Sequence, residues 1–284
     1  MADPKAARLA AIRAANAQKA VAPTDVSQPT LVDLRSIEAT QAAISGPPPA
    51  PERLDDLPPA MSPQTVALML LAVGLGVFAA VVVLPTWLPG LSASLLGPEP
   101  KAYWYLSRAS AFVAFGLLWL SMALGLLMTN KLARVWPGGP VAFDLHQHTS
   151  LLGLAIGLFH ALILLGDGYS NYSLAQLLVP FATGSYRPLW VGLGQIGFYL
   201  MAIVGLSFYL RQRIGRNMWR LIHFLSFAMY LLALLHGLQS GTDSAALWAR
   251  AIYWGSGASL LFLTIYRVLV ALVRPAQARR QRAA

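Results

Sequence analysis

Long uninterrupted apolar runs dominate the chain after about residue 60. Six of them have the roughly 20 residues that an α-helix needs to cross a bilayer, at about 64–84, 104–128, 143–166, 188–210, 218–239 and 248–272. The runs are continuously apolar and do not alternate, which favours helices over the strands of a β-barrel. The pattern predicts an all-α polytopic membrane protein, a bundle of six transmembrane helices.

Composition supports this reading and separates three regions. The chain is 57% hydrophobic and 11% charged, against about 25% charged residues in soluble domains. Residues 1–60 form an Ala-rich basic stretch and then a Pro-rich stretch, SGPPPAPERLDDLPPA, which predicts an extended linker. The first stretch is either a docking helix or a solvated tail. We expect the transmembrane domain over 61–273 and a short basic tail over 274–284.

The net charge of +10 reads as a topology signal and not as a nucleic-acid surface, because the cations cluster at the ends of spans. Three loops or tails carry them: Lys131 and Arg134; Arg211, Arg213 and Arg216; Arg274, Arg279, Arg280 and Arg282. The opposite loops hold Lys101 and Arg187 with three acids. The bias predicts that both termini are cytoplasmic, and we expect a bacterial plasma membrane with lipid around the bundle.

The chain has no cysteine. This excludes disulfides, thiolate metal ligands, iron–sulfur clusters and covalently attached haem c. Charges interrupt any apolar core at the amino terminus, so we expect the first span to act as the insertion signal.

All five histidines lie in two of the predicted spans. The third span reads DLHQHTSLLGLAIGLFH and holds His146, His148 and His160, and the fifth holds His223 and His236. Ionisable side chains inside a membrane cost free energy and need a partner or a role. Ordinary helix–helix hydrogen bonding explains one such residue better than five.

The spacing places these histidines in two layers. His146 and His160 are 14 residues apart, which is about 21 Å of rise and only about 40° short of four whole turns. His223 and His236 are 13 apart, and an ideal helix would rotate them about 140° from each other. We therefore expect a local π or 3₁₀ irregularity in the fifth span, or two directions of approach.

Both spans run from inside to outside, so His146 matches His223 in depth and His160 matches His236. Two stacked b-type haems, each held by one histidine from each helix, require this arrangement. A zinc site needs three or four converging ligands, which these pairs do not supply. A haem-free proton or metal transporter stays open. His148 belongs to neither pair. We expect it to bind a propionate or to face the lipid headgroups, and a role as an alternative ligand of the inner haem stays open.

Arginines near the predicted haems are candidate partners for the anionic propionates. Arg108 and Arg187 suit the outer haem, and Arg220, Arg267 and Arg134 suit the inner one. Snorkelling to the headgroups is the alternative for Arg187 and Arg220. Gly153 and Gly157 in the third span either let a porphyrin approach the backbone or serve helix packing.

The histidine spacings, the six-span layout and the pieces YLSRAS, SYRPLW, WRLIH and LLHG resemble the ferric reductase-like transmembrane domain superfamily. Ferric reductases, the membrane cores of NADPH oxidases and the haem-binding membrane partner of bacterial periplasmic methionine sulfoxide reductase belong to it. The resemblance implies that His146 and His223 bind the inner haem, that His160 and His236 bind the outer one, and that Arg108 lies near the outer haem. The 13-residue interval also occurs in that family.

The chain departs from the oxidases because no GxGxxG stretch in a strand–helix context is present. We expect FAD or FMN only on a separate cytoplasmic reductase, or membrane quinol as the donor, with quinone as a further ligand. The expected function is an electron-transfer component that passes electrons to ferric iron, dioxygen or a periplasmic partner protein. The alternative is a quinol-linked cytochrome b anchor subunit, which would also transfer electrons through haem.

Overall fold

The computed structural model of this chain describes residues 57–97, 101–184 and 186–283. The predictions for residues 1–56 lie outside the described residues. Within the described ranges every regular element is helical, and six stretches are long and apolar enough to span a membrane: Pro63–Trp87, Lys101–Thr129, Gly139–Gly166, Pro188–Ile214, Arg216–Ser240 and Leu247–Val273. All six predicted spans are confirmed, with ends that differ by a few residues.

The elements follow in chain order. They are α3 (Pro63–Phe78), η2 (Ala79–Val83), α4 (Leu84–Trp87), α5 (Pro89–Leu96), α6 (Lys101–Thr129), η3 (Leu132–Arg134), α7 (Gly139–Leu162), η4 (Ile163–Gly166), α8 (Leu174–Leu178), α9 (Pro188–Ile214), α10 (Arg216–Phe224), α11 (Ser226–Ser240) and α12 (Leu247–Ala283). The helix that begins the sixth span continues through the predicted basic tail as far as Ala283.

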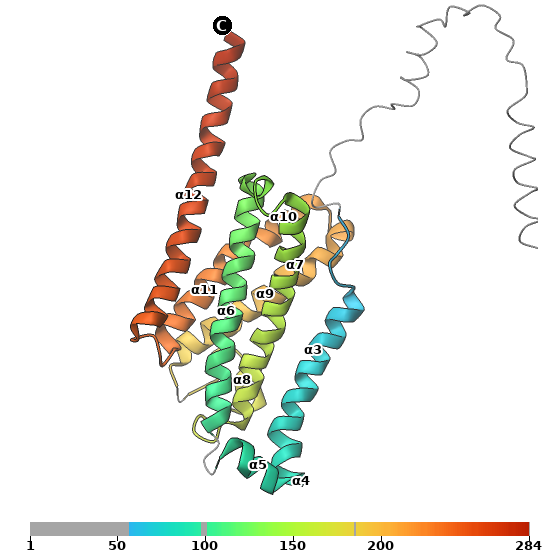
Figure 1. The fold of residues 1–284 in the computed structure, drawn as a ribbon, viewed down its shortest axis with the longest axis vertical. Helices are drawn as coiled ribbons and strands as arrows, with labels where there is room; N and C mark the ends of the chain where they lie inside the picture. Colours follow the sequence, from blue (N-terminus) through green and yellow to red (C-terminus); the bar gives the residue numbers. More distant parts are fainter. Residues whose placement is uncertain (1–56, 98–100, 185, 284) are drawn as a thin grey trace, which may run out of the picture. The chain divides into compact units, whose positions relative to one another are not determined.

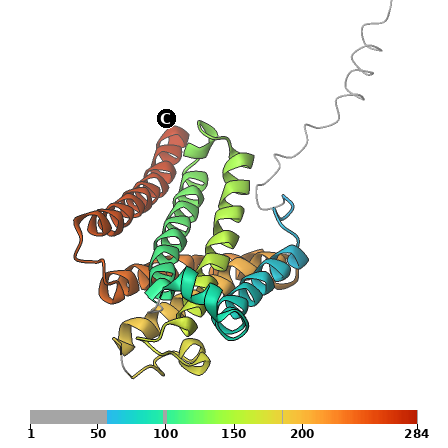
Figure 2. The same ribbon diagram turned by 60° about the horizontal axis from the view of Figure 1, so that its bottom comes forward.

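Four of the spans form the centre of the bundle (Figure 1). α6 packs along α7, α9 packs against α10 and α11, and α7 also meets α9, so these elements surround a common interior. α3 packs on α7, while α12 packs on α6 and α11 (Figure 2). The interior that carries the histidines is therefore enclosed mainly by α6, α7, α9 and the two halves of the fifth span.

Polar contacts between helices hold the outer members of the bundle, as expected where lipid gives no hydrophobic drive for helix association. The Tyr230 hydroxyl donates to Ser256 Oγ at 2.8 Å, and Trp119 Nε1 donates to Ser259 Oγ at 2.9 Å. Both bonds fix α12 to its neighbours. In the π-helical segment η2, which continues α3, the Ala80 carbonyl accepts a hydrogen bond from the Tyr103 hydroxyl of α6 at 2.6 Å.

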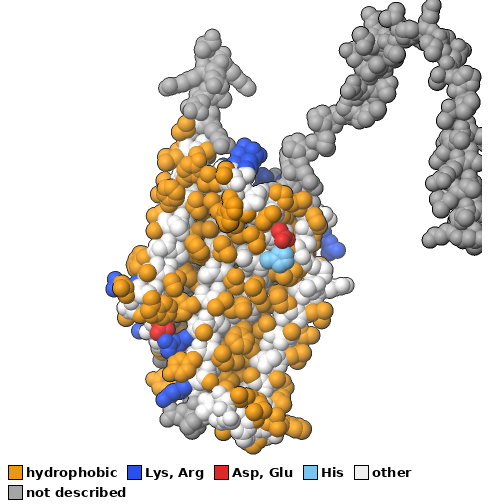
Figure 3. Space-filling view, in the orientation of Figure 1, with side chains coloured by type: hydrophobic (Ala, Val, Ile, Leu, Met, Phe, Trp, Pro, Cys, Tyr) orange, Lys and Arg blue, Asp and Glu red, His pale blue; other side chains and the backbone are white. Residues whose placement is uncertain are grey.

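Apolar side chains cover most of the face drawn in Figure 3. Leu75, Leu261 and Phe262 are examples from the outer helices, each more than half exposed. Such exposed apolar surface is what a lipid-facing helix presents. We call the end of the bundle with residues 130–138 and 211–220 the basic end, and the end with 167–187 and 241–246 the opposite end.

Candidate functional site

Four of the five histidines lie in two facing pairs inside the bundle. The ring centres of His146 and His223 are 6.0 Å apart, and those of His160 and His236 are 6.3 Å apart. α7 supplies one histidine to each pair, and the fifth span supplies the other. The pairs lie toward the basic end and the opposite end respectively, which is the pairing that the sequence spacing predicted.

The fifth span contains the irregularity that this pairing requires. α10 ends at Phe224 and α11 begins at Ser226, and the amide of Leu225 between them donates to the Ile222 carbonyl, three residues back, at 3.0 Å. A three-residue turn advances the chain by about 120° per residue, more than an α-helix does. The tighter turn reduces the rotational mismatch between His223 and His236, so the predicted break is confirmed.

The separation of the paired rings fits a metal held between two imidazoles. An imidazole nitrogen binds a metal ion at about 2.0–2.1 Å, so two ligands on opposite sides, with their ring radii added, place the ring centres about 6 Å apart. The observed 6.0 and 6.3 Å match that value. Each pair is therefore spaced as two imidazoles that hold one metal ion between them would be.

In three of these rings, the Nδ1 atom makes a hydrogen bond to a backbone carbonyl. Nδ1 of His146 lies 2.8 Å from the Ser121 carbonyl, Nδ1 of His160 lies 2.8 Å from the Ser107 carbonyl, and Nδ1 of His236 lies 2.9 Å from the Trp190 carbonyl. A carbonyl oxygen only accepts, so Nδ1 carries the proton in each ring. Nε2 is left as the unprotonated nitrogen, the form that binds a metal.

The described residues contain no group of three or more histidine, cysteine or acidic side chains able to hold a metal ion. A tetrahedral zinc site of the ordinary kind is therefore not formed by them. Two protein ligands suffice for a metal ion whose remaining ligands come from a bound group such as a porphyrin.

Each histidine pair lines its own cavity. His160 and His236 line a cavity of about 260 Å³ toward the opposite end, and His146 and His223 line one of about 710 Å³ toward the basic end. We call them the outer and the inner cavity, after the orientation that the sequence predicts. Cofactor pockets commonly measure about 300–1,000 Å³, so the inner cavity lies within this range and the outer cavity lies just below it. Three side chains line both cavities and so lie between them: Leu118, Met201 and Met229. The two sites are adjacent but distinct.

The glycines of α7 pack against a neighbouring helix. A Cβ atom on Gly153 would lie 2.9 Å from Met201 Cε, and one on Gly157 would lie 3.5 Å from Phe198. Both partners belong to α9, and both glycines also line the outer cavity. Helix packing, one of the two predicted roles, is thus seen directly.

Gly194 permits a close approach between α9 and His236 in the outer site, and sequence reasoning missed it. A Cβ atom here would lie 2.5 Å from His236 Nδ1. The absence of a side chain lets α9 come near enough for the Trp190 carbonyl, one turn earlier, to accept from the same nitrogen. Gly194 and Trp190 together set the position of His236.

Arg108 lines the outer cavity, as predicted for a propionate partner, but its guanidinium also pairs with a carboxylate. Its Nε donates to Asp243 Oδ2 at 3.0 Å, and a terminal nitrogen contacts Oδ1. Asp243 lines the same cavity. A bidentate ion pair therefore lines the outer cavity.

Tyr172 also lines the outer cavity. Burial raises the pKa of its phenol, which keeps the side chain protonated.

The remaining arginines divide between cavity and surface. Arg220 and Arg267 line the inner cavity, where they suit an anionic group. Arg187 contacts the Gln239 carbonyl and lines neither cavity, and Arg134 lines neither cavity. The structure thus brings Arg220 and Arg267 to the inner cavity and leaves Arg187 and Arg134 outside both cavities.

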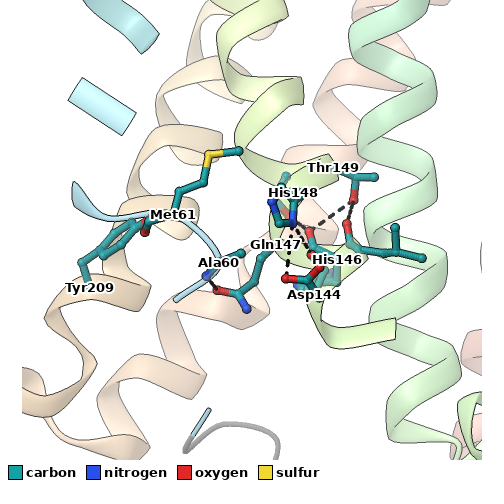
Figure 4. A network of polar contacts seen from close by, with 10 residues as sticks. Ala60, Met61, Asp144, His146, Gln147, His148, Thr149 and Tyr209 are labelled. Atoms are coloured by element: carbon teal, nitrogen blue, oxygen red, sulfur yellow. Dashed lines mark hydrogen bonds and ion pairs between the residues drawn. The ribbon is translucent and has the colours of Figure 1, made fainter. Parts of the chain in front are cut away.

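His148 faces away from both cavities. Its side chain is 44% exposed, and Nδ1 lies 3.0 Å from the Asp144 carbonyl and 3.4 Å from a carboxylate oxygen of the same residue (Figure 4). Of the roles predicted for His148, the surface role fits this position.

Residues 57–62, which we call the strap, contact side chains of α7 and α9, and Figure 4 shows the contacts of Ala60 and Met61. The Ala60 amide donates to Gln147 Oε1 at 3.0 Å, the Tyr209 hydroxyl donates to the Met61 carbonyl at 2.9 Å, and Arg211 donates to the Leu57 carbonyl at 3.0 Å. Gln147 and Tyr209 also line the inner cavity. The strap thus connects α7 and α9 beside the inner pair.

Ser107 and Ser121 were also missed by sequence reasoning, although a signal was present. They are 14 residues apart on α6, the same interval that separates His160 from His146 on α7. Two antiparallel helices with matched intervals bring both serine–histidine pairs together. Asp243 gave no such signal, because it lies 135 residues from Arg108 in a loop.

Comparison with protein-family models, with curated proteins and with solved structures found no match for this chain.

Proposed function

We propose that the protein is a two-haem b-type cytochrome of the membrane, an electron-transfer component with haem-binding histidines from α7 and the fifth span. His146 and His223 would hold the inner haem, and His160 and His236 the outer one. The observation that carries the proposal is the pair of ring separations, 6.0 and 6.3 Å. We further propose, from the sequence resemblance, that the chain belongs to the ferric reductase-like superfamily.

A haem bound at each pair would accept and release single electrons. The protein groups contribute binding and electrostatics. Three of the histidines present Nε2 because Nδ1 is bound to a carbonyl. Arg220 and Arg267 at the inner cavity would neutralise anionic propionates. Arg108 would do so at the outer cavity, with Asp243 holding the guanidinium in place.

We infer that electrons enter at the basic end and leave at the opposite end. The basic end would lie in the cytoplasm. With a membrane potential that is negative inside, moving one electron outward across the whole field is favourable by about 2.3 kcal/mol per 100 mV. A separate flavin reductase or membrane quinol would be the donor. Ferric iron, dioxygen or a periplasmic oxidoreductase would be the acceptor, and a bacterial plasma membrane would be the location.

Replacing single ligands tests this proposal. His160→Ala or His236→Ala should remove the outer haem and leave the inner one, and His146→Ala or His223→Ala should do the reverse. Each variant should therefore bind about half the haem of the unaltered protein, measured as pyridine haemochrome per chain.

His148→Ala is the matched control, since this histidine lies on the same helix and faces away from both cavities. It should leave the haem content unchanged. Full haem content in the His160→Ala and His236→Ala variants, or loss of haem in the control, would contradict the assignment.

A further inference from the structure

Two serines of α6 make the same contact with the two histidines of α7. Ser107 Oγ lies 3.0 Å from His160 Nδ1, and Ser121 Oγ lies 3.0 Å from His146 Nδ1. In both cases the carbonyl of the same serine lies 2.8 Å from that nitrogen. One serine therefore offers two oxygens to one imidazole N–H.

The direction of the hydroxyl proton at the outer site follows from its second partner. Ser107 Oγ donates to the His160 carbonyl at 3.0 Å. A hydroxyl has a single proton, so the same oxygen must accept from Nδ1–H. These two hydrogen bonds, from Nδ1–H to the hydroxyl and from the hydroxyl to the carbonyl, form a closed ring together with the covalent bonds of His160.

The inner site closes the same ring through one more hydroxyl. Ser150 Oγ donates to the His146 carbonyl at 2.6 Å, so in its 2.6 Å contact with Ser121 the proton comes from Ser121. Ser121 Oγ is then also an acceptor for Nδ1–H of His146. In both sites, a serine hydroxyl of α6 thus accepts from Nδ1–H of a histidine of α7.

Ordinary packing of serine does not explain these contacts. Serines in membrane helices commonly donate to the carbonyl of the preceding turn. Ser207 on α9 does this, donating to the Val204 carbonyl at 2.7 Å. Ser107 and Ser121 are 3% and 5% exposed, line the outer and inner cavities respectively, and direct their hydroxyls to another helix.

We propose that Ser107 and Ser121 are positioning residues that each tune one haem independently. This inference rests on the proposed function. An acceptor on Nδ1–H makes the imidazole a stronger electron donor through Nε2, and hydrogen bonding around a ligand is one of the levers on haem potential. Each hydroxyl therefore holds the ring in one orientation and lowers the reduction potential at its own site.

The test is a potentiometric titration of the purified, haem-loaded protein, followed by absorbance and by low-temperature electron paramagnetic resonance. Ser107→Ala should raise the midpoint of one haem and leave the other unchanged. Ser121→Ala should raise the midpoint of the other haem. Ser207→Ala, which removes a buried hydroxyl of α9 that lines neither cavity, should move neither midpoint.

Threonine variants keep the test decisive where alanine weakens binding. If Ser107→Ala loses one haem, Ser107→Thr should keep it with the unaltered midpoint, because threonine retains the hydroxyl. Unchanged midpoints in both alanine variants, or an equal shift in Ser207→Ala, would overturn the inference while the haem content still supports the proposed function. Unaltered protein without haem would overturn the proposed function itself, and this inference with it.

Discussion

Three of the four paired histidines are held by hydrogen bonds to residues of another helix, and this dependence limits what the sequence can reveal. The spacing of His146, His160, His223 and His236 predicted the two pairs, because helix geometry converts intervals into positions. The groups that hold the rings, such as Ser107 and Trp190, are set by packing between helices. Single-helix periodicity carries no information on those contacts.

The same limit applies to charge. Arg108 was a candidate because an arginine in apolar sequence needs a partner. That partner, Asp243, comes from the loop between the fifth and sixth spans. Only the packed bundle brings the two side chains together.

Gly194→Ala should disturb the outer site selectively. The added methyl would lie 2.5 Å from His236 Nδ1, and overpacking of this kind costs about 1–3 kcal/mol. We expect weaker haem retention at one site, measured as loss of about half of the haem during purification, with the other haem spectrally unchanged. Gly116→Ala is the control, because a Cβ there meets nothing within 4 Å. Equal retention in both variants would show that the close approach does not matter.

Among the elements, the fifth span shows how far a pattern can predict structure. The 13-residue interval could not place two histidines on one side of an ideal helix, so the sequence predicted either an irregularity or two directions of approach. The tight turn at Leu225 is that irregularity. The strap was not predictable, because three of its contacts run from backbone groups to side chains about 90 to 150 residues away.

Loss of one strap contact should loosen residues 57–62 without unfolding the bundle. Tyr209→Phe removes the hydroxyl that donates to the Met61 carbonyl, and a hydrogen bond contributes about 0.5–1.5 kcal/mol net. The Ala60 amide should then exchange about 2- to 10-fold faster with deuterium, measured by mass spectrometry. Tyr199→Phe, which loses a contact with the Leu178 carbonyl elsewhere on α9, should leave Ala60 unchanged. Identical exchange in both variants would argue against the strap.

For the whole molecule, the distribution of cations predicts one orientation. The chain has no native cysteine, so single cysteines can report the side of the membrane. Val135 at the basic end and Tyr169 at the opposite end are 90% and 93% exposed. In intact bacterial cells an impermeant maleimide should label Tyr169→Cys, and it should label Val135→Cys only after permeabilisation. The reverse pattern would invert the direction of electron flow proposed above.

The central claim is that this bundle holds two haems. The most direct measurement is the dithionite-reduced minus oxidised absorbance spectrum of the detergent-purified protein, with the haem-to-protein ratio from pyridine haemochrome. We predict a b-type spectrum and two haems per chain. A colourless protein that also fails to take up added haem would contradict the account and would leave the histidine pairs as candidates for a proton or metal pathway.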